Sequence, residues 1–166
     1  MPRSFDVAVD SPASVDQVFA AFSSEDYWLA RIATQSGHSA LESVLVEDGQ
    51  TVRVTTEQDL GPDLLPGIVA KFYRRDIKIR HTETWTPAGD QLRGEISVAV
   101  SGAPGSGSAT ASVAPTENGS VLTVNGTVEF KVPLVGGTVE SFIAREFANG
   151  VPDLRDFTAR WVTENA

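Results

Sequence analysis

Residues 134–163 read LVGGTVESFIAREFANGVPDLRDFTARWVT, and this stretch decides the fold. Its apolar residues recur at steps close to the helical period: Val135, Val139, Phe142, Ile143, Phe147, Leu154, Phe157 and Trp161. The spacing predicts one long amphipathic helix, about 45 Å in length at 1.5 Å per residue. Because Pro152 lacks the amide hydrogen that a helix interior requires, we expect a kink or a split at Gly150-Val151-Pro152.

The residues before this helix alternate between apolar and polar side chains over most of their length. Residues 3–10 predict a half-buried strand, followed by a helix capped by Ser11 with Pro12 at its first position. A second short helix is predicted from Glu25 to Gln35. Further strands are predicted at 39–48, 51–60, 72–86, 91–102, 108–115 and 120–132, the first two forming a hairpin at Asp48-Gly49.

The predicted order is therefore one strand, two helices, six strands and one long helix, or β-α-α-β6-α. This order fits an α+β fold in which helices cover one face of a seven-stranded antiparallel sheet, with residues 1–166 forming one domain. A curved sheet of that size leaves volume beneath a single helix, and such volume is a common ligand site.

The composition excludes several classes of function. The chain has 166 residues, a net charge of −9, no cysteine and only two histidines, His38 and His81. The negative charge disfavours nucleic-acid binding, and the residue counts exclude disulfides, thiolate metal sites and three-histidine metal sites. The sequence shows no P-loop, Gly-x-Ser-x-Gly elbow or metal-ligand spacing, so we expect no metal, no cofactor and no catalytic residues. An apolar leader or spanning segment is also lacking, so we expect a cytoplasmic protein, with association to a membrane surface as an alternative.

Three segments of the chain resemble the START-like, or SRPBCC, superfamily. They are SPASVDQVF at residues 11–19, TETW at 82–85 and PLVGGTVE at 133–140. The resemblance covers nearly the whole chain, is closest to an actinobacterial branch, and implies the helix-grip fold, a curved seven-stranded antiparallel sheet wrapped around a long C-terminal helix. It also implies a hydrophobic ligand, because members bind lipids, sterols, polyketides or other apolar molecules between sheet and helix. A few members are cyclases or hydroxylase components.

The strand predicted at 72–86 carries the strongest candidates for chemistry. Its alternation places Ile77, Ile79, His81, Glu83 and Trp85 on one side, which faces the interior if the two isoleucines do. The Cα atoms of His81 and Glu83 are then about 7 Å apart, and the two side chains can hold or protonate a polar ligand group. Alternatively, a twist or bulge of the strand brings both side chains to the solvated rim of the sheet. We favour this position at the rim over a catalytic role for the two residues.

We expect a cavity lined by inward residues of the sheet and the helices. The predicted lining comprises Trp28, Ile32, Ile77, Ile79, His81, Glu83, Trp85, Ile96, Val98, Ala111, Val128, Phe130, Phe142, Ile143, Glu146 and Phe147. Small residues such as Ala109 and Ala111 favour open volume, whereas plain core packing is the alternative for most of the aromatic residues. Glu146 lies near the inward stripe of the last helix, where a buried carboxylate can serve as an acid or anchor a ligand hydroxyl. At the edge of the stripe it would instead pair with Arg145 or Arg31.

A basic stripe interrupts the otherwise acidic chain, and it comprises Lys71, Arg74, Arg75, Lys78 and Arg80. Lys78 and Arg80 alternate with the isoleucines of the strand and so face outward. The stripe fits anionic lipid headgroups or an acidic partner, while an outer face balanced by nearby acids is the alternative that we favour. A monomer and a homodimer are both compatible with the sequence.

Two functions of different classes follow from these patterns. The first is a carrier or sensor that binds a lipid or other hydrophobic small molecule without catalysis, with His81 or Glu83 orienting a polar group. The second is a cyclase-, aromatase- or hydrolase-like enzyme that uses His81 with Glu83 or Glu146 as acid and base. The lack of a catalytic constellation favours the first.

Overall fold

The computed structural model describes residues 2–34, 38–48, 50–60, 77–132 and 136–165. Along the chain the elements are β1 (Arg3–Ser11), α1 (Val15–Phe22), α2 (Glu25–Ile32), β2 (His38–Glu47), β3 (Thr51–Leu60), β4 (Ile77–Ala88), β5 (Gln91–Ser101), β6 (Gly105–Thr116), β7 (Gly119–Phe130) and α4 (Gly136–Glu164). The strands form a seven-stranded sheet in the order β1-β7-β6-β5-β4-β3-β2, and every neighbouring pair is antiparallel. The predicted fold class and element order are confirmed.

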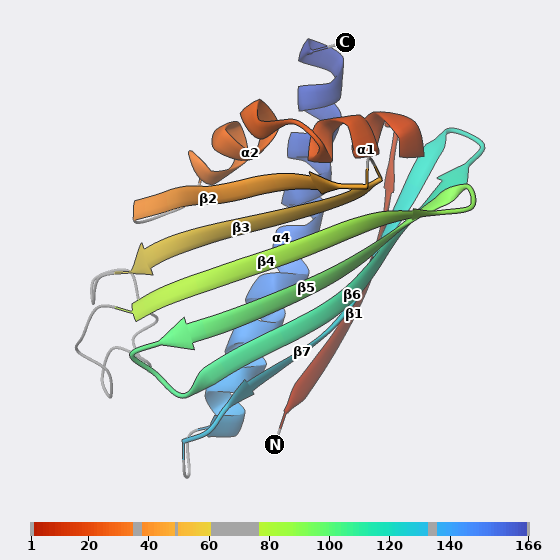
Figure 1. The fold of residues 1–166 in the computed structure, drawn as a ribbon. Coiled ribbons are helices and arrows are strands. Elements are labelled where there is room, and N and C mark those ends of the chain that lie inside the picture. Colours follow the sequence, from red (N-terminus) through yellow and green to blue (C-terminus); the bar gives the residue numbers. More distant parts are fainter. Residues whose placement is uncertain (1, 35–37, 49, 61–76, 133–135, 166) are drawn as a thin grey trace.

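The sheet curves around α4, which crosses one of its faces (Figure 1). The helix packs mainly against β1 and β7, and α1 packs against its C-terminal part. The two short helices lie together at one end of the sheet. The main contacts of the helices with the sheet thus lie along the β1 edge and at the end near α1 and α2.

The first helix begins three residues later than predicted. Ser14 is its N-cap, and Ser14 and Gln17 form a capping box in which each side chain accepts a hydrogen bond from the other's backbone amide. Ser11 is instead the last residue of β1, and its hydroxyl accepts a bond from the amide of Ala13. The predicted cap at Ser11 with Pro12 in the helix is therefore wrong, because strand pairing extends through Ser11 and the capping box provides the better start.

The strands match the predicted ones apart from their ends. The hairpin of β2 and β3 is confirmed, and Asp48 takes the positive φ of 52° that a tight turn requires. The fourth strand, predicted at 72–86, runs from Ile77 to Ala88, while residues 72–76 lie outside the described part of the chain. The second helix ends at Ile32, with Ala33 as its C-cap, instead of continuing to Gln35.

The long helix is continuous through Pro152, so the predicted split does not occur. Its 29 residues correspond to a length of about 44 Å. A proline removes one helical hydrogen bond, but burial of the neighbouring Val151 keeps this segment packed on the core. The helix can therefore present side chains to the sheet on both sides of the proline.

The end of the sheet next to α1 and α2 is filled by aromatic side chains. Trp85 on β4 lies opposite Gly94 on β5, and a Cβ atom at Gly94 would come within 2.5 Å of the indole ring. Phe22 packs on the same indole at 4.8 Å between ring centroids, and it also contacts Tyr27 and Trp28. This cluster closes one end of the space between sheet and helix.

Candidate functional site

A cavity of about 400 Å³ lies between the middle of the sheet, the end of α2 and the second half of α4. Its apolar lining comprises Phe5, Ile96, Val98, Ala109, Val124, Val128, Phe147, Val151, Leu154 and Phe157. Its polar lining comprises Arg31, Thr34, His81, Glu83, Ser108, Thr127 and Asp153. Thr34, Gly150 and Asp153 are exposed, so the mouth of the cavity lies where α2 ends near α4.

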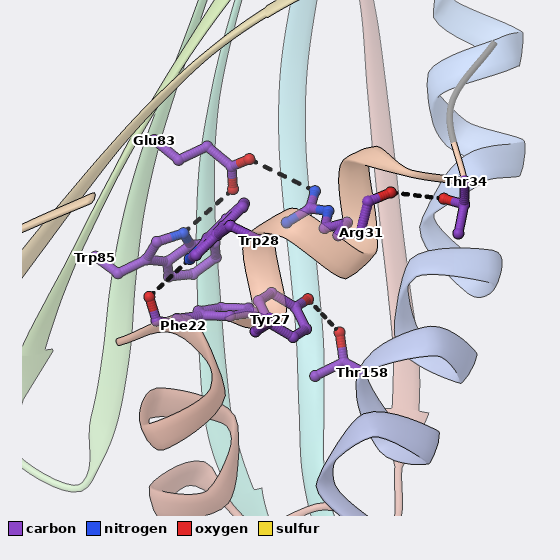
Figure 2. Close-up of polar contacts among 8 residues, drawn as sticks. All are labelled: Phe22, Tyr27, Trp28, Arg31, Thr34, Glu83, Trp85 and Thr158. Atoms are coloured by element: carbon purple, nitrogen blue, oxygen red, sulfur yellow. Dashed lines mark hydrogen bonds and ion pairs between the residues drawn. The ribbon is translucent and has the colours of Figure 1, made fainter. Parts of the chain in front are cut away.

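An ion pair lines this cavity. The Nη2 atom of Arg31 on α2 lies 3.5 Å from Oε2 of Glu83 on β4, and the side chains are 19% and 8% exposed, respectively. The other oxygen of Glu83, Oε1, accepts a hydrogen bond of 3.2 Å from Nε1 of Trp85 (Figure 2). The two oxygens of this buried carboxylate thus have different partners, a cation and a neutral donor.

Aromatic residues hold the ion pair in place (Figure 2). The guanidinium carbon of Arg31 lies 4.7 Å from the centroid of Trp28, within cation–π distance. Trp28 donates from Nε1 to the carbonyl of Phe22 at 2.8 Å, and the hydroxyl of Tyr27 shares a 2.7 Å hydrogen bond with Thr158 on α4. These contacts fix α2 between the sheet and α4, so the guanidinium is positioned before any ligand binds.

Burial and neighbouring charges shift the pKa values of this cluster. Burial lowers the pKa of His81, the Glu83 carboxylate opposes this effect, and the Arg31 cation adds to it. The imidazole is therefore neutral at pH 7 and has one nitrogen to donate and one to accept. Burial raises the pKa of the Tyr27 hydroxyl. Burial alone would lower the pKa of Arg31, but Glu83 and Tyr27 outweigh it and raise that pKa, so the guanidinium stays charged.

A second cavity of about 230 Å³ adjoins the first. Most of its lining is aliphatic or aromatic: Ile77, Ile79, Val98, Val100, Ala103, Val128, Phe130, Ile143 and Phe147. Gln58, His81, Ser106, Glu129 and Glu140 supply its polar side chains. The space beneath the helix is therefore divided into a chamber with a charged pair and a more apolar chamber.

Most residues of the predicted lining reach one of the two cavities. These are Ile77, Ile79, His81, Glu83, Ile96, Val98, Val128, Phe130, Ile143 and Phe147. The rim alternative for His81 and Glu83 is wrong, because both side chains line the first cavity. Whether these residues bind a ligand stays a prediction.

Six residues of the predicted lining take other positions. Trp28, Trp85 and Ala111 are buried in the solid core, and Ile32 and Phe142 are half-buried but line neither cavity. Glu146 is exposed and lines neither cavity, so the prediction of a buried carboxylate there is wrong. Large aromatic residues at the end near α1 have partners that fill the space, and inward orientation alone does not reveal this.

Sequence reasoning missed Glu140, the carboxylate that α4 does bury. It lines the second cavity, and its Oε2 accepts a hydrogen bond of 2.9 Å from the amide of Phe130. Glu140 precedes Ile143 by three residues and Phe147 by seven, so helical spacing from these two residues would have found it. Arg31 was considered only as a partner for Glu146, although it follows Tyr27 by one helical turn.

The outer face of β4 carries the described part of the basic stripe. Arg80 pairs with Glu42 at 2.7 Å and with Glu57 at 3.1 Å, and Lys78 lies 4.0 Å from Asp59. These contacts agree with the alternative in which nearby acids balance the stripe. Lys71, Arg74 and Arg75 lie outside the described residues.

The described ranges contain no group of three or more His, Asp or Glu side chains placed to hold a metal ion. Within the same ranges, every helix is too short or too polar to span a bilayer.

Comparison with known proteins places this chain in a family. Residues 6–162 match the family described as "Protein of unknown function (DUF2505)". Uncharacterised proteins from Mycobacterium tuberculosis (strain ATCC 25618 / H37Rv) and Mycobacterium bovis are each 36% identical over 174 residues, covering 99% of both chains. The relatives are thus actinobacterial, as the resemblance predicts.

Solved structures show the same fold at low sequence identity. A protein from Thermus thermophilus gives a TM-score of 0.59 at 16% identity, covering 100% of this chain and 99% of its own. Norcoclaurine synthase from Thalictrum flavum gives 0.57 at 16% identity, covering 99% and 88%. Ara h 8.0201 gives 0.54 at 13% identity, covering 99% of both chains. The chain therefore belongs to the DUF2505 family and has the Bet v1-like helix-grip fold.

Proposed function

We propose that this protein binds a hydrophobic small molecule with a polar end between the sheet and α4, as a carrier or sensor without catalysis. The observation that carries this proposal is the cavity of about 400 Å³, whose lining is mostly apolar but includes the Arg31–Glu83 pair. Its volume lies within the range of about 300–1,000 Å³ that is typical of small-molecule sites. Apolar burial supplies affinity, and the few polar groups orient the ligand.

A related structure supports a small-molecule ligand for this fold. Norcoclaurine synthase from Thalictrum flavum has been solved in complex with dopamine and hydroxybenzaldehyde, at a TM-score of 0.55 to this chain. Both are small aromatic molecules that carry polar groups. By analogy of fold alone, a molecule of comparable character fits here.

The polar groups of the cavity suit ligand orientation better than acid–base catalysis. Both oxygens of Glu83 already have partners, in Arg31 and Trp85, so this carboxylate is held as a structural anion. The neutral imidazole of His81 can donate or accept one hydrogen bond from a ligand hydroxyl or carbonyl.

An enzyme is the second candidate, favoured by the neutral His81 in the same cavity as Glu83. A histidine with a lowered pKa is a free base at neutral pH, as general base catalysis requires. The exposed Glu146 is not placed to share this role. If an identified ligand is converted to a product at a rate that His81→Ala abolishes without loss of binding, the enzyme is the correct function.

A cavity-filling variant tests the carrier proposal. Gly107 lines both cavities, and a Cβ atom built there meets its neighbours at 3.6–3.7 Å, which is ordinary contact. A leucine at this position would therefore project into the cavities without a backbone clash. Thr110→Leu, on the exposed face of the same strand, is the matched control.

The readout is native mass spectrometry with extraction and identification of co-purified molecules. Wild type and Thr110→Leu are expected to carry a bound hydrophobic species, and Gly107→Leu to carry at least ten-fold less of it. If wild type carries no such species and takes up no fatty acid or other amphiphile added to it, the proposal is wrong.

A further inference from the structure

The two cavities are separated by a single row of side chains across the sheet. His81, Val98, Gly107 and Val128 are direct partners in register on the four adjacent strands β4 to β7. All four residues line both cavities. From the other side, Phe147 of α4 also lines both cavities. We call these five residues the dividing row.

The cavities lie on opposite sides of the dividing row along the strands. The next inward-facing residues toward the end of the sheet that aromatic side chains fill are Glu83, Ile96 and Ala109. They are partners in register and line the first cavity. The next inward-facing residues toward the opposite end of these strands are Ile79 and Val100, which are partners in register and line the second cavity. The cavities are therefore consecutive segments of one space between the sheet and α4.

The dividing row is thin on the sheet side. Gly107 has no side chain, so the division depends on its neighbours and on Phe147. The ring of Phe147 stacks on Phe5 of β1 at 6.1 Å between centroids, with 9° between the planes. The Phe5 ring in turn lies over Gly126, where a Cβ atom would come within 2.4 Å of it. On the helix side, one aromatic side chain, Phe147, thus stands between the two segments, and it stacks on one other, Phe5.

Polarity changes along this space. At the mouth of the first cavity are Thr34 and Asp153, and the Arg31–Glu83 pair lines the same cavity. Beyond the dividing row, the positions next to it on β4 and β5, Ile79 and Val100, are aliphatic, and the buried carboxylate of that cavity, Glu140, already accepts a hydrogen bond from the amide of Phe130. A ligand with its polar group near the mouth and its tail beyond the dividing row keeps polar atoms near water or polar partners and buries only hydrocarbon.

We propose that one ligand occupies both cavities, and that it is an unbranched single-chain amphiphile whose tail passes Phe147 into the second cavity. This inference rests on the proposed function and names its ligand class. With about 30 Å³ for each non-hydrogen atom, the volume of one water in the liquid, the first cavity holds about 13 such atoms and the second about 8. A chain that fills only the first cavity has about ten carbons, and a longer chain must enter the second.

The test is a chain-length series of saturated fatty acids, from octanoate to stearate, titrated calorimetrically into delipidated protein. Each methylene that becomes buried raises the affinity about four-fold. For wild type we expect the affinity to continue rising beyond ten carbons, to about 18 carbons. This series needs no variant.

Two variants on β5 separate the cavities. Val100→Phe fills part of the second cavity alone, and Ile96→Phe fills part of the first alone, on either side of the dividing row. Val100→Phe should bind octanoate within two-fold of wild type but palmitate at least ten-fold more weakly. Ile96→Phe should weaken both acids. If Val100→Phe does not fold by circular dichroism, Ile79→Phe in the same row of the second cavity replaces it.

The possible results distinguish this inference from the proposed function. A wild-type affinity that stops rising at about ten carbons, or Val100→Phe and wild type with equal affinity for palmitate, overturns the inference and leaves the proposed function intact. Binding of compact hydrophobic molecules with no binding of any fatty acid overturns it as well. If nothing hydrophobic binds, both are wrong.

Discussion

The buried ion pair offers the sharpest test of how the site is held together. Arg31→Met keeps most of the side-chain stem but removes the charge beside Glu83, whose side chain is only 8% exposed. Glu83→Gln removes the other charge while leaving an amide oxygen that accepts the hydrogen bond from Trp85. The double variant removes both charges, so the three together form a double-mutant cycle.

The geometry sets the expected magnitudes. Removing one member of a buried pair destabilises proteins by about 3–5 kcal/mol, because the other charge stays buried without its partner. Arg31 is 19% exposed and lies 3.5 Å from Glu83, longer than a charge-assisted hydrogen bond, so about 2–3 kcal/mol is expected for Arg31→Met. That value includes the contact with Trp28, worth about 0.5–1 kcal/mol. Glu83→Gln should cost about 1–2 kcal/mol, and the double variant about 1–2 kcal/mol less than the sum.

Urea unfolding at pH 7.5, followed by tryptophan fluorescence, measures these free energies. Arg80 on the outer face of the same strand gives the control, because it pairs with Glu57 at 3.1 Å but is 50% exposed. The cycle of Arg80→Met and Glu57→Gln should show a coupling of only about 0.2–1 kcal/mol. If the Arg31 and Glu83 effects add within about 0.5 kcal/mol, or if Arg31→Met is as stable as wild type, the ion pair does not hold the site.

Two further predictions concern packing and pH. Gly94→Ala places a methyl group within 2.5 Å of the Trp85 ring and should destabilise the fold by about 1–3 kcal/mol. Gly137→Ala, whose added methyl group has nothing within 4 Å, should not destabilise it. Equal stability of the two variants in thermal unfolding would contradict this prediction. Burial lowers the pKa of His81 below the value of about 6.5 that an unfolded chain restores, so the unfolded chain binds the proton first as the pH falls. Wild type should therefore lose up to about 1.4 kcal/mol per pH unit below pH 6.5 relative to His81→Gln, and parallel stability curves between pH 7.5 and 5.5 would refute this.

Much of the sheet follows from the sequence, because short turns join most of its neighbouring strands. Alternation marks the strands, and a tight turn such as that at Asp48 makes the two strands that it joins neighbours. The pairing of β1 with β7 joins distant parts of the chain, and no turn specifies it. The element order predicts a seven-stranded sheet but does not show that its first and last strands pair. The split expected at Pro152 does not occur for the opposite reason, because tertiary packing overrides a local signal for a break.

The sequence predicts which side chains of the site face the interior, but not which of them line open volume. Alternation correctly turned both His81 and Trp85 inward, yet only His81 lines a cavity. The two residues differ in what surrounds them on the neighbouring strand and on the helices. Trp85 covers Gly94 and meets Phe22 at 4.8 Å, so its surroundings are full. His81 pairs with Val98, and both residues line the first cavity. The sequence of one strand does not show what lies opposite it across the core.

The persistence of this open volume is itself an argument for a ligand. A hydrophobic ligand that covers the apolar walls of the first cavity gains about 25 cal/mol for each Å² of apolar surface that it removes from water. The helix is kept from closing the gap by packing at both ends, through Tyr27 and Thr158 on one side and through Phe130 and Val139 on the other. Because packing at these two ends keeps the cavity open, a ligand that fills it stabilises the folded state. Ligand binding should therefore raise the unfolding temperature of wild type far more than that of Gly107→Leu.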